Sequence, residues 1–475
     1  MHLHIYSMLW LVIAAPVCVA VSGVERAELL KEIEMTPPLP DFSKYFEAIP
    51  ALGRKLRCSS PCIGIHGCGH ALNFMQVPTH SNNVFDLDER YRECLHQHML
   101  DAGMVPVEII LNLGKRLGDL LRRGLRHLEL PVDILVCGPP CPPWAGQGCH
   151  NSFKDARAKV FCRIIEWIVF LAHCGGLLCV LVENVIGVTH MHMGMEPPMD
   201  KFLRILRTHV PFFSWSVDTL CAVSYMCPQT RVRTFLRGMR TSVVYPVPRP
   251  LEAFGQRRMR EALGKFPCTP RSHWTPQQQL NLRCYEELII SACQEDRLLM
   301  DDIVVVAADR QQGLTYLQQM TVNNAPTFTT GNKELCIISV RDVVENVPDH
   351  AREFFRRFKE TERLTFMGFP PELVLTLGRQ LTWKATGNAY PPPLIVAGLQ
   401  PLIMALARST SFQFFSWPPV GTISHVVPDN IMRLARSMLN SRGMIADKAK
   451  YAEAKAKAKR MASRKRSVIS DSDSS

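Results

Sequence analysis

Two short apolar runs separated by a helix-like stretch constrain the fold of this chain more than any other feature. Residues 132–137 (VDILVC) indicate a buried strand that stops at a Gly-Pro-Pro turn, and residues 177–182 (LLCVLV) indicate a second strand. Between them, residues 156–172 carry apolar side chains at helical spacing. Strand, helix and strand in this order predict a right-handed crossover between parallel strands, and therefore an α/β fold.

Length and composition are those of a globular chain with more than one domain. Of 475 residues, 47% are hydrophobic and 21% are charged, which excludes a disordered chain, a collagen-like chain and a polytopic membrane protein. Seventeen cysteines over this length are not the dense framework of a small secreted domain, and they indicate a reducing compartment. Cys58, Cys62, Cys68 and His70 fit no common zinc spacing, so we expect no metal site.

The two ends of the chain differ from its body. Residues 1–24 contain an apolar run that is too short for a comfortable membrane span and is either a targeting signal or an extension. Residues 411–475 form a linker and a basic tail, in which Arg464-Lys465-Arg466 is typical of nuclear localisation or polyanion binding. We expect a nuclear protein without stable membrane association. The alternative is that the apolar segment of residues 1–24 is a targeting signal and directs the protein elsewhere.

The net charge of +12 permits a polyanionic partner such as nucleic acid and lies in two runs. Between Arg231 and Arg271, ten Lys or Arg residues stand against two acids. Between Lys448 and Arg466, nine stand against one. We expect the first run to meet nucleic-acid phosphates and the second to serve localisation or loose tethering.

Nucleophilic and acidic side chains follow the two predicted strands, at the edge where ligands bind in open α/β sheets. Cys141 lies in GPPCPPW, where prolines on both sides keep the turn from becoming helical, and a thiolate is a strong nucleophile. Glu183 ends the second strand in apolar surroundings that raise a carboxyl pKa, so it is a candidate proton donor. The alternatives are a packed thiol at a proline turn and a structural acid at a strand end.

These residues resemble those of the cytosine-5 methyltransferases that act on DNA. GPPCPPW at 138–144 and ENV at 183–185 resemble the motifs around the catalytic cysteine and glutamate, and PQTRVR at 228–233 resembles a Gln-x-Arg-x-Arg motif. Further matches in the expected order are GDL at 118–120, Asp155-x-Arg157, GFP at 368–370 and GNA at 387–389. The resemblance covers about residues 58–406.

The resemblance implies a fold and a domain organisation. The fold would be a Rossmann-like methyltransferase domain of the α/β class with a mostly parallel sheet, over residues 45–245. A smaller target-recognition domain would be inserted at 246–359, and residues 360–410 would return to the catalytic domain.

The resemblance also implies an activity, the transfer of a methyl group from S-adenosylmethionine to carbon 5 of cytosine in DNA. Cys141 would add to C6 of the base, Glu183 would hydrogen-bond or protonate N3, and Arg233 and Arg231 would hold the base carbonyl and the active loop. The target base would leave the double helix to reach Cys141. The alternatives are a tRNA cytosine-5 methyltransferase of the same fold and a catalytically silent nucleic-acid-binding relative.

The cofactor turn departs from the family pattern, which is Phe-x-Gly-x-Gly-Gly after the first strand. Here Ile65 stands for the Phe and His70 for the last Gly, while the two middle glycines remain and suit close backbone approach to a cofactor. Asp86, which follows the strand-like residues 83–85, would bind the ribose hydroxyls, and Asp119 would reach the adenine. The residues implied to bind the cofactor are Gly67, Gly69, Asp86, Asp119 and Asn388.

Overall fold

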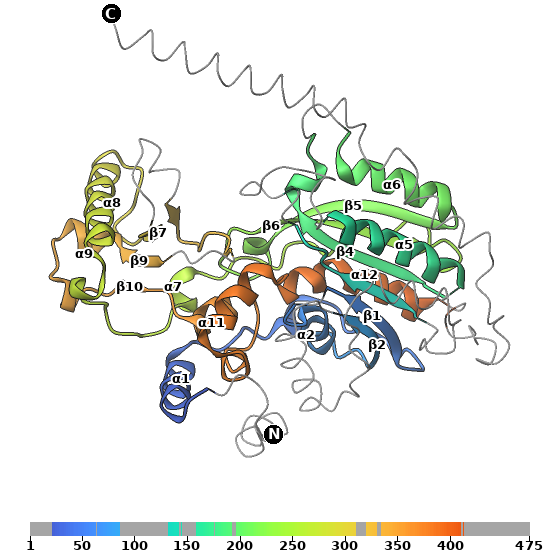
Figure 1. Cartoon of the computed structure of the whole chain (residues 1–475), viewed down its shortest axis with the longest axis horizontal. Coiled ribbons are helices and arrows are strands. Elements are labelled where there is room, and N and C mark those ends of the chain that lie inside the picture. The colour runs from blue at the N-terminus through green and yellow to red at the C-terminus, as the bar shows by residue number, and fades with distance from the viewer. Residues whose placement is uncertain are drawn as a thin grey trace, which may run out of the picture. The chain divides into compact units, whose positions relative to one another are not determined.

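The structure, a computed structural model, describes residues 21–62, 64–85, 132–141, 144, 158–174, 176–191, 196–309, 320–329, 334–409 and 412. These residues form two compact units, drawn in Figure 1. The large unit contains the described residues of 40–85, 132–256 and 389–412. The small unit contains those of 21–39 and 257–388.

A six-stranded sheet forms the centre of the large unit, in the order β2-β1-β3-β4-β6-β5. The pairs among β1, β2, β3 and β4 are parallel, and β6 runs antiparallel to both of its neighbours. The prediction of a mostly parallel sheet in an α/β protein is therefore confirmed. The strands are β1 Leu56–Pro61, β2 Thr79–Phe85, β3 Ile134–Cys137, β4 Cys179–Val185, β5 Phe213–Cys221 and β6 Val232–Arg240.

The crossover predicted from the sequence joins β3 to β4. The helix α5 (Ala158–Cys174) connects the two strands, and Ile134 pairs with Cys179 in a parallel register that continues to Cys137 and Val182. β4 extends three residues beyond the predicted strand, so Glu183 lies within the strand rather than after it.

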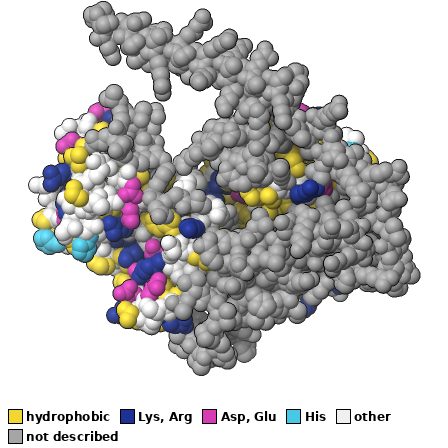
Figure 2. Space-filling model, in the orientation of Figure 1, with side chains coloured by type: hydrophobic (Ala, Val, Ile, Leu, Met, Phe, Trp, Pro, Cys, Tyr) yellow, Lys and Arg dark blue, Asp and Glu magenta, His cyan; other side chains and the backbone are white. Residues whose placement is uncertain are grey.

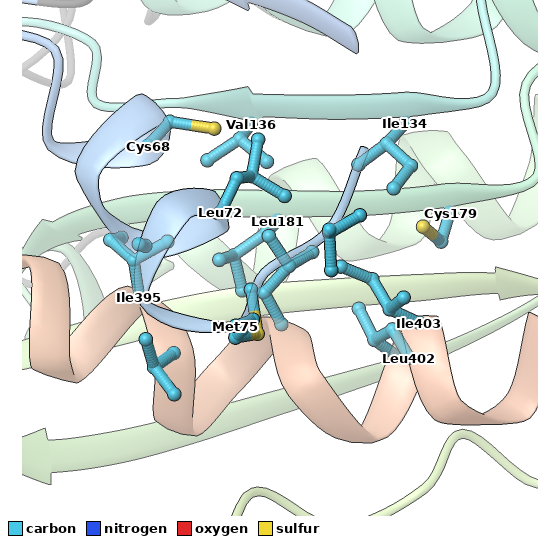
Figure 3. Packing of buried hydrophobic residues seen from close by; sticks show 14 of the residues in the cluster. Cys68, Leu72, Met75, Ile134, Val136, Cys179, Leu181, Ile395, Leu402 and Ile403 are labelled. Carbon is cyan, nitrogen blue, oxygen red and sulfur yellow. The ribbon is translucent and has the colours of Figure 1, made fainter. Parts of the chain in front are cut away.

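Alternation of side chains along β3 and β4 covers both faces of this sheet. On one face, Val136 and Leu181 pack with α2 (Gly67–Phe74) and α12 (Pro392–Arg408), as Figure 3 shows. On the other face, the alternate residues of the same strands pack with α5 and α6 (Pro198–His209). α12 is apolar all round and almost wholly buried, as expected for a core helix. Single-turn 3-10 helices span Phe42–Tyr45, Ile186–Thr189 and Ala222–Ser224.

The small unit is built on a four-stranded antiparallel sheet in the order β10-β9-β7-β8. Its strands are β7 Ile303–Ala307, β8 Thr321–Val322, β9 Leu335–Ser339 and β10 Phe355–Arg357. The long helix α8 (Pro276–Gln294) begins with a capping box of Thr275 and Gln278 and packs its apolar face on the sheet. Trp274 and Tyr285 belong to this core rather than to a surface that could stack bases.

The other helices of the small unit are α1 Gly23–Met35, α7 Met259–Ala262, α9 Val340–Val344, α10 Glu360–Phe366 and α11 Leu373–Asn388, with short 3-10 turns at Arg271–His273 and Asp349–Ala351. Ion pairs hold α1 to this unit, since Glu32 lies 2.9 Å from Lys359 Nζ and 2.9 Å from Arg379 Nη1. Thr36 adds a hydrogen bond to Thr361. Helix α1 is therefore part of the small unit despite its distance along the sequence.

Helix α11 forms the end of the small unit, and residues 386–388 lie in its last turn. The predicted domain limits at 246, 359 and 360 stay a prediction, and the compact small unit extends to residue 388. Within the described residues, no single helix is long and apolar enough to span a membrane. The consecutive helices α11 and α12, taken together as one bent pair, have the length and composition of a span.

Candidate active site

The register of β4 against β6 builds a buried ion pair at the carboxyl end of β4. Glu183 follows Leu181 by two positions, so it faces the side of the sheet that α2 and α12 cover. Glu183 pairs with Phe235 and Val185 pairs with Arg233, which makes Arg233 a diagonal neighbour of Glu183. Arg233 Nε lies 2.8 Å from Glu183 Oε1, and both residues are 8% exposed. The sheet thus brings together two predicted site residues.

Arg231 lies just before β6 and connects the site to the start of α12. It is 1% exposed, and its Nη2 donates a hydrogen bond of 2.5 Å to the carbonyl of Ala389. The positive charge of Arg231 also acts on both Glu183 and Cys141. The structure therefore places Arg231, Arg233, Glu183 and Cys141 in one electrostatic cluster.

Cys141 lies in a turn that is anchored from both sides. The N–H of Trp144 donates to the carbonyl of Cys141 at 2.9 Å, and the Trp144 side chain is fully buried against the edges of Phe161 and Phe202. On the other side, Asn184 Nδ2 donates to the carbonyl of Pro139 at 3.2 Å. The Cys141 thiol is half-buried, and it is held at a fixed place beside the Glu183 strand.

Gly187 makes room for this turn. A methyl group at residue 187 would lie 2.0 Å from the backbone oxygen of Trp144, which is closer than atoms pack. The glycine therefore lets the chain after β4 pass directly beside the catalytic turn. Sequence reasoning overlooked both Gly187 and Asn184, although the latter lies inside the recognised ENV motif.

Burial and the two arginines have opposite effects on the pKa values of Glu183 and Cys141. Burial raises the pKa of Glu183 above its usual value, against the effect of Arg233 and then Arg231. Burial also raises the pKa of Cys141. The nearby charge of Arg233 lowers this pKa, that of Glu183 raises it, and that of Arg231 lowers it by a smaller amount. The carboxyl pKa is raised in the direction that the sequence analysis expected, and the role of Glu183 as a proton donor stays a prediction. The thiol needs the two arginines to favour its thiolate form.

The glycine turn directs backbone N–H groups from the start of a helix. β1 ends at this turn and α2 begins at Gly67, with His66 as an N-cap in the left-handed conformation that makes no side-chain cap. The first N–H groups of a helix have no partner within it, so they are available to ligands. A methyl group at Gly69 would lie 2.4 Å from the His66 ring, so this glycine admits the histidine.

The remaining predicted cofactor residues are not joined to this cluster. Asp86 and Asp119 lie outside the described residues. Asn388 ends α11, is exposed and belongs to the small unit. The Sγ atoms of Cys58 and Cys68 lie 3.8 Å apart in the core, and the described part of the chain contains no group of three side chains able to hold a metal ion.

Four arginines at the start of the basic run between residues 231 and 271 do not form the phosphate-binding surface that we predicted. Arg231, Arg233 and Arg237 alternate along β6 and therefore share its inward face. Arg237 is fully buried, with Asp218 Oδ2 at 3.2 Å, and Arg240 donates to the carbonyls of Leu177 and Ala172. The prediction is wrong for these four arginines because the guanidinium group of each is engaged by carbonyl or carboxylate oxygens of the protein.

Farther along the run, two basic side chains of the small unit are paired with acids. Arg260 pairs with Glu353, and Arg271 pairs with Glu286 and Asp349. On the described part of the face drawn in Figure 2, basic and acidic side chains of this unit are interspersed rather than gathered. The charge that seemed concentrated along the sequence is therefore dispersed in space.

A half-buried thiol, a buried carboxyl and two arginines thus lie together at the carboxyl edge of a mostly parallel sheet, the edge where ligands bind in α/β proteins. The sequence pattern of the C-5 cytosine-specific DNA methylases matches residues 114–402. The chain belongs to this family, and the matched range includes Cys141, Glu183, Arg231 and Arg233.

Several solved structures are similar to this chain, each with 14% sequence identity. The methyltransferase EhMeth of Entamoeba histolytica has a TM-score of 0.44, with 74% of this chain and 98% of that chain covered. A triple mutant of DNMT2 from Spodoptera frugiperda has 0.46, with 73% and 99% covered. The Dnmt2 methyltransferase of S. pombe has 0.44, with 74% and 99% covered. No curated protein matches the chain.

Proposed function

We propose that this protein transfers a methyl group from S-adenosylmethionine to carbon 5 of cytosine in DNA, through a covalent adduct with Cys141. The observation that carries the proposal is the buried Glu183–Arg233 pair on the strand beside the anchored Cys141 turn. A buried acid next to a fixed thiol is what addition to the cytosine ring requires, because C5 is a poor nucleophile until a group adds at C6.

The residues act in a balanced sequence. The Cys141 thiolate forms a bond to C6, and Glu183 gives a proton to N3, so that the electron pair of the C5–C6 double bond becomes available at C5. S-adenosylmethionine, when bound, supplies an electrophilic methyl group. A base then removes the C5 proton, the bond between Cys141 and C6 breaks, and N3 returns its proton to Glu183.

The arginines have separate tasks in this scheme. Arg233 and Arg231 lower the pKa of the Cys141 thiol and so raise its thiolate fraction. Arg233 also orients the Glu183 carboxyl through Oε1, which leaves Oε2 beside Gly138. Gly67 and Gly69 would approach the cofactor through their backbone. The nuclear localisation of the protein stays a prediction.

DNA is proposed as the substrate because the matching family is one of DNA methylases. The arginines that we expected on duplex phosphates are buried, so the catalytic unit gives no further support for a double helix over a folded RNA. Each substrate is therefore one arm of the test.

The test is incubation with S-adenosylmethionine and with duplex DNA or tRNA that contains 5-fluorocytosine. Fluorine blocks the loss of the C5 substituent, so the wild-type protein should form a covalent adduct that survives denaturing electrophoresis. Cys141→Ser should form none. Cys162→Ser is the matched control, because this half-buried cysteine lies on α5 outside the cluster, and it should keep the adduct.

The outcomes separate the alternatives. An adduct with DNA supports the proposal, whereas an adduct with tRNA alone would replace DNA by tRNA as the substrate. No adduct with either nucleic acid, under conditions in which calorimetry shows cofactor binding, would identify a catalytically silent relative.

A further inference from the structure

The aromatic ring of Tyr390 is wedged between two glycines that belong to different motifs. A methyl group at Gly67, in the cofactor turn, would lie 2.8 Å from Cδ2 and 2.9 Å from Cε2 of the ring. A methyl group at Gly138, in the catalytic turn, would lie 2.6 Å from Cδ1 and 2.7 Å from Cε1 on the opposite edge. Both turns therefore have a glycine where the ring needs room.

The two glycines lie at neighbouring strands of the large sheet. Gly67 follows β1 and Gly138 follows β3, and these strands are hydrogen-bonded to each other. The methyl group added at Gly138 would also lie 3.2 Å from Glu183 Oε2. The ring thus fills the space between the cofactor turn and the catalytic turn, next to the proton donor.

The backbone holds Tyr390 firmly in this place. The carbonyl of the preceding Ala389 accepts the hydrogen bond from Arg231, and α12 begins at Pro392, two residues after Tyr390. The Tyr390 side chain is 2% exposed. A ring that is fixed by a catalytic arginine on one side and a core helix on the other is a rigid spacer.

The hydroxyl of Tyr390 has no hydrogen-bond partner among the described residues. An unpaired buried hydroxyl costs about 1–3 kcal/mol. Burial raises the pKa of Tyr390, and Cys68, Cys137 and Glu183 raise it further, which places the phenol among residues of α2, β3 and β4. The ring, and not its hydroxyl, is therefore the part of Tyr390 that contacts both turns.

We propose that Tyr390 is a positioning residue that sets the separation between the cofactor turn and the catalytic turn for methyl transfer. The proposal rests on the proposed function. Reaction between two bound groups requires atoms held about 3–3.5 Å apart, and a displacement of about 1 Å costs roughly 100-fold in rate. Tyr390 touches both turns, so its loss should impair the step that joins them and spare the steps that each turn performs alone.

The experiment measures these steps separately in the wild type, Tyr390→Val and Tyr390→Phe. Release of tritium from C5-labelled cytosine in DNA or tRNA, without cofactor, reports the addition by Cys141 and Glu183 alone. Calorimetric affinity for S-adenosylhomocysteine reports the cofactor turn alone. Methyl transfer from S-adenosylmethionine reports both together. Valine has no atom beyond the γ position, so Tyr390→Val removes the wedge.

We expect Tyr390→Val to keep tritium release and S-adenosylhomocysteine affinity within about threefold while methyl transfer falls about 30- to 100-fold. Tyr390→Phe keeps the ring and should restore transfer. The proposal is overturned if all three measurements fall together, if transfer does not fall, or if Tyr390→Phe loses as much as Tyr390→Val. A wild type that shows neither tritium release nor transfer overturns the proposed function itself, and this inference with it.

A size exchange gives a second test that does not depend on the stability of one variant. Gly138→Ala should collide with the ring and reduce tritium release, and adding Tyr390→Val should restore it, because only ring atoms lie within 3 Å of the new methyl group. Gly67→Ala, read by its loss of affinity for S-adenosylhomocysteine, is the matched control, since its methyl group would lie 2.6 Å from the backbone oxygen of Tyr390, which Tyr390→Val retains. Tyr390→Val should not rescue this variant. Equal rescue of both variants, or of neither, contradicts the wedge.

Discussion

Each unit of the molecule buries a pair of glutamate and arginine, and the two pairs differ in how completely they are satisfied. In the small unit, Arg356 binds Glu362 through two hydrogen bonds of 2.8 and 2.7 Å. Glu362 also accepts hydrogen bonds from the N–H groups of Gly264 and Lys359. Both of its oxygens are filled, as in a structural ion pair.

In the large unit, Glu183 is paired with Arg233 through one oxygen only. No described residue donates a hydrogen bond to the other oxygen, which lies beside Gly138. The comparison teaches that burial of a charged pair does not by itself mark a catalytic site. The unfilled oxygen and the raised pKa distinguish the Glu183 pair from the Glu362 pair, and the neighbouring Cys141 turn is what makes Glu183 the proposed proton donor.

The largest expected effect is on catalysis, in Glu183→Gln. Glutamine cannot transfer a proton to N3, so turnover should fall about 10²- to 10⁴-fold, the usual contribution of general acid catalysis. The free energy of unfolding should also fall, because Arg233 is left buried without its counter-ion, so turnover is compared per folded molecule. Turnover within fivefold of the wild type, measured with radiolabelled cofactor, would remove Glu183 from the chemistry.

Glu362→Gln should act on stability and not on chemistry. It leaves Arg356 buried without its counter-ion, so the free energy of unfolding should fall by about 3–5 kcal/mol. Urea denaturation followed by circular dichroism measures the change. A loss below about 1 kcal/mol would show that the small unit does not depend on its filled pair.

Glu166 on α5 is a third buried glutamate and an intermediate case. One oxygen binds Arg163 at 2.7 Å, the other has no partner in the described structure, and burial raises its pKa to about 7. Folding therefore takes up a proton between pH 4.5 and 7, and the wild type loses stability as the pH rises through this range. Relative to the wild type, Glu166→Gln should gain about 2 kcal/mol between pH 5 and pH 8, at about 1.4 kcal/mol per pKa unit. Urea denaturation measures the free energy of unfolding of both proteins. The same difference between variant and wild type at pH 5 and at pH 8 would contradict this prediction.

The smallest expected effect is on the thiol, in Arg233→Gln. Loss of the positive charge raises the pKa of Cys141, so the thiolate fraction below that pKa falls, by about tenfold for each unit. Alkylation of the Cys141 peptide by iodoacetamide, followed by mass spectrometry from pH 7 to 10, should show the curve displaced to higher pH.

Arg237→Gln is the control for this displacement, because it lies on the same strand and face but pairs with Asp218. It should leave the alkylation curve of Cys141 in place. An identical displacement in both variants would mean that the strand is perturbed and that Arg233 has no specific role.

The sequence predicted the parts of the fold that depend on local pattern. The continuous apolar runs that became β3 and β4 and the helical spacing of α5 were enough to indicate a parallel crossover. The antiparallel pairing of β7, β9 and β10 was not predictable, because residues far apart in the sequence form it and each strand by itself has no preferred partner.

The candidate site was predictable in its nucleophile and acid and less so in its surroundings. Cys141 and Glu183 follow recognisable turns and strand ends, whereas the basic run was misread because charge was counted along the chain. The alternation that buries Arg231, Arg233 and Arg237 was visible in the sequence and would have indicated an inward face. Nothing local indicates that Tyr390 lies between Gly67 and Gly138, since that contact depends on the packing of α12.

The attachment of α1 to the small unit has a consequence for how the protein is made. Glu32 on α1 must wait for partners 327 and 347 residues later in the chain. At about 5–20 residues per second, a ribosome needs on the order of half a minute to deliver them. During that interval the large unit's strands β1 to β6 emerge, so they can begin to pair before the first helix finds its place. Helix α1, which is synthesised before all of these strands, is therefore among the last elements to be secured.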